Sequence, residues 1–87
     1  MLDRVSSTLM SAIKPCGESL RSADDPAQQL RFRVDASGDQ VHHISRVSGA
    51  LPPGVADCIE QKWHAARFAP VDSALALELD VAVRDLR

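Results

Sequence analysis

The stretch P-P-G-V-A-D-C-I-E-Q-K-W-H-A-A-R-F-A-P, residues 52–70, decides the fold together with A-L-A-L-E-L-D-V-A-V, residues 74–83. Pro53 suits the first turn of a helix, where no backbone N–H is needed, and Asp57 and Glu60 favour the positive end of the helix dipole. Apolar or partly apolar residues then recur three and four apart, at Val55, Cys58, Ile59, Lys62 or Trp63, and Ala66. Because Pro70 forbids further helix, the stretch predicts a helix followed by an extended exit.

Residues 74–83 show a different period. Leucine and valine at the odd positions alternate with smaller or charged residues at the even positions, and the alternation lasts ten residues. A period of two predicts a strand with one buried face and one wetter face.

The start of the chain carries a second helical stripe. Its apolar residues are three or four apart, at Leu2, Val5, Leu9, Ile13, Cys16 and Leu20. Pro15 would clash with the carbonyl of Ser11, so we expect a helix over about residues 2–14, a kink, and a looser turn that reaches Leu20.

Two strands are expected between the helices. Alternation over residues 30–34 predicts a half-buried strand, and Gly38 suits a hairpin position with positive φ. The return strand, residues 40–47, has Val41 and Ile44 three apart, which cannot share a face on a regular strand. We therefore expect a bulge near His42 and His43.

The predicted fold class is α+β, in the order helix, strand, strand, helix, strand. A right-handed crossover makes the second and third strands parallel to each other, with the first strand antiparallel between them, in a three-stranded antiparallel/mixed sheet. Both helices would cover one face and leave residues 74–83 on an open edge. The expected core consists of Leu9, Ile13, Leu30, Phe32, Val34, Val55, Ile59, Phe68, Leu75, Leu77 and Leu79.

Composition indicates one small domain over residues 1–87. The net charge is −2 without a basic cluster, which argues against nucleic acid and against an anionic membrane as partners. No apolar run is long enough to insert into a membrane, and no signal peptide is evident. The chain is therefore either cytosolic or a segment of a longer protein.

Candidate chemical residues have simpler interpretations. His42, His43 and His64 lack metal-ligand spacing with the two cysteines, so we expect no metal and no cofactor. Asp57 and Glu60 are three residues apart, a spacing that an acid/base pair could have. The helix dipole already explains two acidic residues near the start of a helix, so we expect that the protein is not an enzyme. Phe68 is expected to plug the core with Arg67 covering it, rather than to contact a partner, and Trp63 to be half-buried.

Several motifs together resemble a known family. They are Asp35-x-x-Gly38-x-x-Val41, Ser48-Gly49 with Leu51, and Arg67-Phe68-x-Pro70 before the last strand. This pattern resembles the C-terminal domain of TonB-type energy transducers and TolA, and most of all the cysteine-containing AgmX/PglI C-terminal domain of myxobacterial envelope and gliding-motility proteins. Cys58 lies ten residues before Phe68, and Cys16 stands four before Leu20, as in that variant.

The resemblance implies a non-enzymatic, periplasmic protein–protein interaction domain at the end of a longer, inner-membrane-anchored protein. It would bind an outer-membrane or periplasmic protein by strand addition along the last strand. The partner strand would be flanked on one face by Ala74, Ala76, Glu78, Asp80 and Ala82. The paired cysteine positions imply a disulfide between Cys16 and Cys58, which would also staple so short a chain; two buried reduced cysteines are the alternative. There are two competing interpretations. One is a homodimer formed through the same edge. The other is a small cytosolic regulatory module that has reduced thiols and binds a protein.

Overall fold

The computed structural model describes residues 2–87, without the side chains of residues 2, 3 and 19. Leu2, the expected first member of the N-terminal apolar stripe, therefore has its side chain outside the described part. The elements are α1 (Leu2–Ala12), the 3₁₀ turn η1 (Lys14–Ser19), β1 (Gln29–Gly38), β2 (Gln40–Gly49), α2 (Val55–Ala65), β3 (Val71–Ala82) and the 3₁₀ turn η2 (Val83–Leu86). This order confirms the predicted succession of helices and strands.

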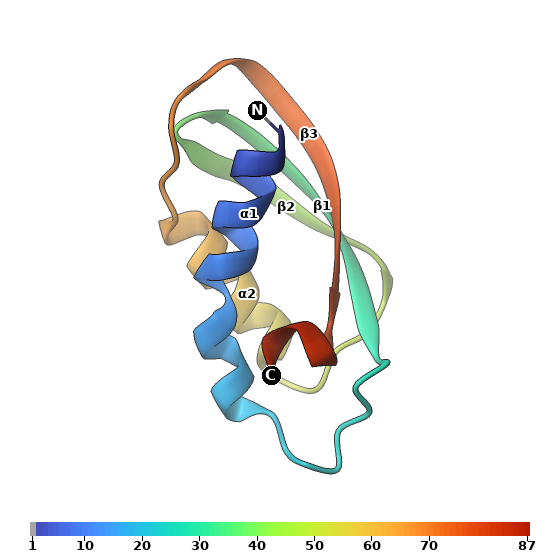
Figure 1. Cartoon of the computed structure of the whole chain (residues 1–87). Helices are drawn as coiled ribbons and strands as arrows, with labels where there is room; N and C mark the ends of the chain where they lie inside the picture. The colour runs from blue at the N-terminus through green and yellow to red at the C-terminus, as the bar shows by residue number, and fades with distance from the viewer. Residues whose placement is uncertain (1) are drawn as a thin grey trace.

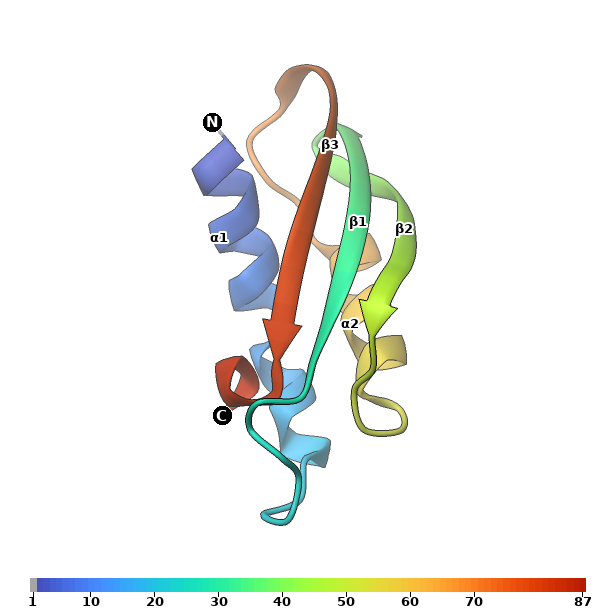
Figure 2. The same cartoon turned by 90° about the vertical axis from the view of Figure 1, so that its right-hand side faces the viewer.

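The three strands form one sheet in the order β2-β1-β3, with β1 antiparallel to both neighbours. The two helices lie on one face of the sheet and leave the other face uncovered (Figure 1). In the view onto the sheet, α2 lies behind β1 and β2, whereas α1 lies beside and behind β3 (Figure 2). The α+β class and the sheet order are therefore as predicted.

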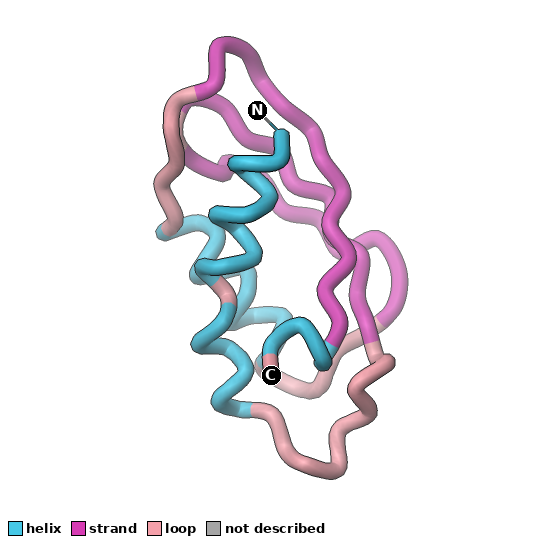
Figure 3. Tube along the Cα trace, viewed as in Figure 1, coloured by secondary structure: helices cyan, strands magenta, loops and turns pink. Residues whose placement is uncertain are grey.

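Pro15 divides the N-terminal helical segment. The α-helix ends at Ala12, and Pro15 falls in the first turn of η1, where its missing N–H has no cost. Gly17 then lets η2 approach, because a Cβ at this position would overlap the carbonyl oxygen of Leu86. Figure 3 shows the 3₁₀ segment running on from α1 before the loop that leads to the sheet.

The hairpin between β1 and β2 follows the sequence pattern in most details. Gly38 has φ of 60°, and the register passes from Asp35 opposite His43 to Ala36 opposite Val41, which leaves His42 as the extra residue of the predicted bulge. A second bulge was not predicted. It lies between the β1 residues 31 and 32 and leaves Val47 of β2 without an opposite residue.

The last strand differs from the predicted range at both ends. It begins at Val71 rather than Ala74, and pairs there with Gly38 across an irregularity in the register. It ends at Ala82, because Val83 opens the turn η2. The C-terminal turn is held by Lys14, whose Nζ donates to the carbonyl of Asp85 at 3.1 Å.

Most of the predicted core is buried, with two differences. The three leucines of β3 and Phe68 are only partly buried, although they pack against the core cluster. Trp63 is 0% exposed rather than half-buried. Its indole Nε1 donates to the carbonyl of Leu9 at 2.8 Å, and its ring meets Phe32 edge-on with centroids 5.0 Å apart. Because the last carbonyls of a helix have no partner within it, Trp63 satisfies one of them and joins α1 to the sheet.

The expected disulfide is present. Cys16 in η1 and Cys58 in α2 are bonded, with Cα atoms 5.8 Å apart and a sequence separation of 42. The bond ties the end of the N-terminal helical segment to the second helix. A disulfide indicates an oxidising, non-cytosolic compartment.

Candidate partner-binding edge

The outer side of β3 has no neighbouring strand within residues 2–87, so its main-chain groups form an edge. The N–H of Val83 donates to the carbonyl of Gln28 at 2.9 Å, towards β1. Main-chain groups of a strand point to alternate sides, so along the regular part of β3 the odd residues face β1 and the even residues face away. The N–H of Ala82 fits this alternation, since it donates to Asp85 Oδ2 at 2.9 Å and not to β1. The N–H and C=O groups of Ala76, Glu78 and Asp80 therefore point to the free edge.

The side chains of the same residues lie on the uncovered face of the sheet. Ala74, Ala76, Glu78 and Asp80 are exposed, as expected from the alternation. Ala82, which we grouped with them, does not belong to the edge, because it is 3% exposed and its N–H is taken by Asp85. The short turn η2 folds back at this point and closes the end of the strand.

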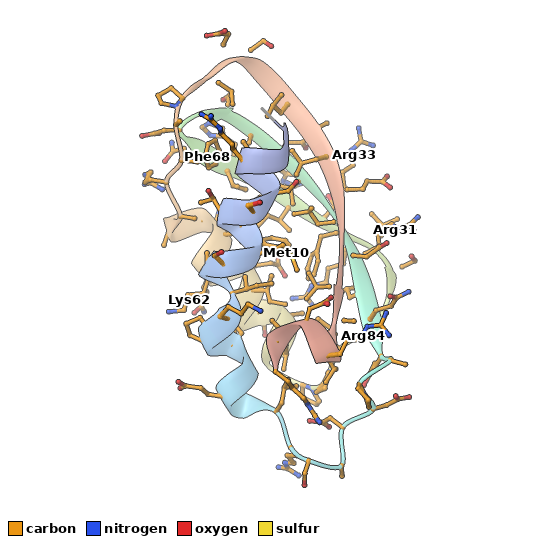
Figure 4. All side chains as sticks on the ribbon, viewed as in Figure 1. Met10, Arg31, Arg33, Lys62, Phe68 and Arg84 are labelled. Carbon is orange, nitrogen blue, oxygen red and sulfur yellow. A yellow bond between two sulfur atoms is a disulfide. The ribbon has the colours of Figure 1, made fainter. Side chains whose placement is uncertain are left out.

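Arg31 of β1 forms ion pairs with two residues of the edge. Its Nε lies 2.8 Å from Asp80 Oδ1, and a second nitrogen lies 4.0 Å from Glu78 Oε2. The hydrogen bond from Arg31 lowers the pKa of the Asp80 carboxyl below its ordinary value. Arg33 stands directly opposite Glu78 in the register, and both arginines point away from the helices (Figure 4).

The other edge of the sheet is less regular. Both bulges displace β2 from an even ladder, and its one strongly exposed large apolar residue is Val47, at 50%. Bulges bend a strand and interrupt the row of hydrogen-bonding groups that another strand would need. Of the two edges, β3 offers the longer regular row.

A groove of about 750 Å³ lies between α1 and the segment that leads into β3. It meets the edge at Val71, the first residue of the strand. Phe68 is partly buried and forms part of the wall, close to the beginning of α1 (Figure 4). The Nη1 of the neighbouring Arg67 donates to the carbonyls of His64 and Ala66 and closes the end of α2.

The remaining candidate residues form ordinary surface contacts. Asp57 and Glu60 both accept hydrogen bonds from Arg46 of β2, and these bonds raise the pKa of the guanidinium above its ordinary value. His42 Nε2 contacts the carbonyl of Ser37, and the other histidines are exposed. In the described part of the chain, no three metal-binding side chains gather.

Comparisons with known proteins identify no related family, protein or structure. A scan against protein-family models, a search of curated proteins and a search of solved structures each find no match. Among residues 2–87, no helix has the length and apolar character needed to cross a membrane.

Proposed function

We propose that this domain is a non-enzymatic protein–protein interaction module that binds an extended segment of a partner protein along β3. The observation that carries the proposal is the free edge at Ala76, Glu78 and Asp80, where three successive even residues direct N–H and C=O groups away from β1. An added strand gains affinity from main-chain hydrogen bonds and selectivity from alternate side chains.

The proposed setting is the periplasm, with the domain at the end of an inner-membrane-anchored, TonB-like energy-transducing or gliding-motility protein. The disulfide between Cys16 and Cys58 supports an oxidising compartment. It disfavours the alternative of a cytosolic regulatory module with reduced thiols. The resemblance in the residues around Gly38, Gly49 and Phe68 supports the envelope assignment.

A displayed library of random ten-residue peptides provides a test without a known partner. Peptides enriched on the wild-type domain should shift the backbone amide resonances of residues 74–80. Replacing Ala76 by proline removes an N–H that the fold leaves unused, so Ala76→Pro should abolish binding while the domain stays folded. Ala76→Val keeps the amide at the same exposed position and is the matched control.

Two results would contradict the proposal. One is equal binding to wild-type and Ala76→Pro protein, with shifts confined to α1 or the hairpin turn. The other is a change of the residue 74–80 resonances with protein concentration alone, because this would identify a second copy as the occupant of the edge.

A further inference from the structure

The inner side of β3 is an incompletely covered part of the apolar core. Leu75, Leu77 and Leu79 are partly exposed although they pack on the core cluster, whereas Phe32 and Val34 beside them on β1 are 0% exposed. A further strand beside β3 would place its alternate side chains next to these leucines. In the view onto the sheet, α1 lies on this side of β3, so those side chains would also face the helix (Figure 2).

The uncovered face of β3 is acidic. The strand carries Asp72, Glu78 and Asp80 and no basic residue. Arg31 and Arg33 stand opposite Asp80 and Glu78 on the β1 side, and Arg31 pairs closely with Asp80 but reaches Glu78 only at 4.0 Å. On the other side of β3 no strand among residues 2–87 supplies a cation. Because residues directly opposite each other in a sheet interact, basic side chains are favoured opposite Glu78 and Asp80.

A second copy is a poorer occupant for the same reason. Two β3 strands paired antiparallel around Leu77 would bring Glu78 and Asp80 of both copies onto one face, and like charges are unfavourable there. Each α1 would in addition lie on the side where the other copy has to approach (Figure 2). The charge of the edge and the position of α1 favour a single extended segment of another protein.

The groove at Val71 adds a site for one end of that segment. Its lining is partly apolar, with Val5 at 2% exposure and the partly buried Phe68, and it bears Ser7 and Thr8 on the helix side. Its volume of about 750 Å³ is within the range of sites that bury an apolar group. A strand paired with residues 76–80 needs only a few more residues to reach Val71.

We propose that the partner segment is apolar at alternate residues, basic at the residues opposite Glu78 and Asp80, and inserts a large apolar side chain into the groove between α1 and residues 68–71. This inference rests on the proposed function, because it names the partner chemistry of the same edge. The main-chain row would hold the segment, the acidic residues would select its outer face, and the groove would fix its register.

Synthetic ten-residue peptides test the three features separately. The parent peptide alternates valine with threonine and has two central lysines on the threonine side. Further peptides carry phenylalanine at the first or at the last position, or glutamate in place of both lysines. One of the two phenylalanine peptides should bind about tenfold more tightly than the parent, and the glutamate peptide should bind more weakly, with the difference shrinking as salt is raised.

Two variants narrow the groove from opposite walls. Ala69→Trp and Ser7→Trp replace exposed residues and should remove the gain from phenylalanine without weakening the parent peptide. Ala50→Trp, at an exposed position outside the groove lining, is the matched control and should keep the gain. Circular dichroism identifies any variant that has lost its fold. If one of the two groove variants is unfolded, the variant on the opposite wall provides the test.

The outcomes separate this inference from the proposed function. If all peptides shift residues 74–80 but phenylalanine gives no gain at either end, the groove is not part of the site. If glutamate peptides bind as tightly as lysine peptides, the charge assignment is wrong. If no peptide shifts residues 74–80, strand addition itself fails, and the partner inference fails with it.

Discussion

Removing the bond between Cys16 and Cys58 should destabilise the domain more than most single core substitutions. The bond closes a loop with 42 residues of sequence separation. With the loop-entropy relation, this length corresponds to about 13 cal/mol/K, or about 4 kcal/mol at 25 °C, before any enthalpic terms. For a chain of 87 residues, each kcal/mol shifts Tm by about 4 to 8 °C, so the reduced protein should melt about 16 to 32 °C lower.

Urea unfolding of oxidised and reduced wild-type protein measures this difference without changing a side chain. Trp63 is the single tryptophan and is 0% exposed, so its fluorescence reports the loss of the core. With m between about 1 and 2 kcal/mol/M, the midpoint should fall by about 2 to 4 M. The double variant Cys16→Ala/Cys58→Ala should resemble the reduced wild type, with a further small loss because Cys16 is 1% exposed.

Two observations would refute this reasoning. Identical masses for untreated protein and for protein reduced without alkylation would show that no bond is present, because reduction adds two hydrogens. Equal midpoints for the oxidised and reduced forms would show that the crosslink constrains nothing that unfolding releases. In the second case the bond would still indicate an oxidising compartment, but not a stabilised domain.

Two further predictions concern the core and the edge. Trp63→Phe should lower the free energy of unfolding by about 2 to 4 kcal/mol in urea titrations, because it leaves the Leu9 carbonyl without its donor and opens a cavity; an unchanged midpoint would contradict this. Arg31→Gln should raise the pKa of Asp80 towards its ordinary value in carboxyl-carbon NMR titrations. In the wild type that pKa is lowered. The pair therefore stabilises the folded state at pH values above the unfolded-state pKa of Asp80, and this stabilisation is lost as pH falls through the folded-state pKa. An identical titration of Asp80 in the variant would contradict the assignment.

The helices and strands were predictable because each carries a regular period over many residues. The hairpin turn and the His42 bulge also followed from local patterns, since Gly38 and the spacing of Val41 and Ile44 leave few alternatives. The start of β3 did not. Asp72 and Ser73 resemble a turn, and only the distant pairing of Val71 with Gly38 draws these residues into the sheet.

Other features depend on packing that a single sequence does not encode locally. Trp63 lies on a helix whose neighbouring residues are polar, so its burial results from the contacts with Leu9 and Phe32 contributed by other elements. The turn η2 was missed because Val81 and Val83 continue the strand alternation, whereas the hydrogen bond from Ala82 to Asp85 turns the chain away.

The sequence predicted which strand forms the free edge, but not which of its main-chain groups face outwards. Chain order and crossover handedness placed the last strand at an edge. Which amides of β3 face outwards depends on the register against β1, and the bond from Val83 to Gln28 decides it. The groove combines residues 4–8 of α1 with residues 68–71, which lie at least 60 positions away in sequence, so no local pattern indicated it.

The two edges of this sheet are protected in different ways, and the difference bears on function. Two bulges interrupt β2, and they hinder pairing with any further strand, whatever side chains that strand carries. β3 keeps a regular row of main-chain groups and relies on acidic side chains at Glu78 and Asp80. Charges repel a strand of the same kind but attract one with basic residues, so this protection is conditional on the partner. In the proposed interaction module, the same two acidic residues would both select a basic partner segment and disfavour pairing with a second copy.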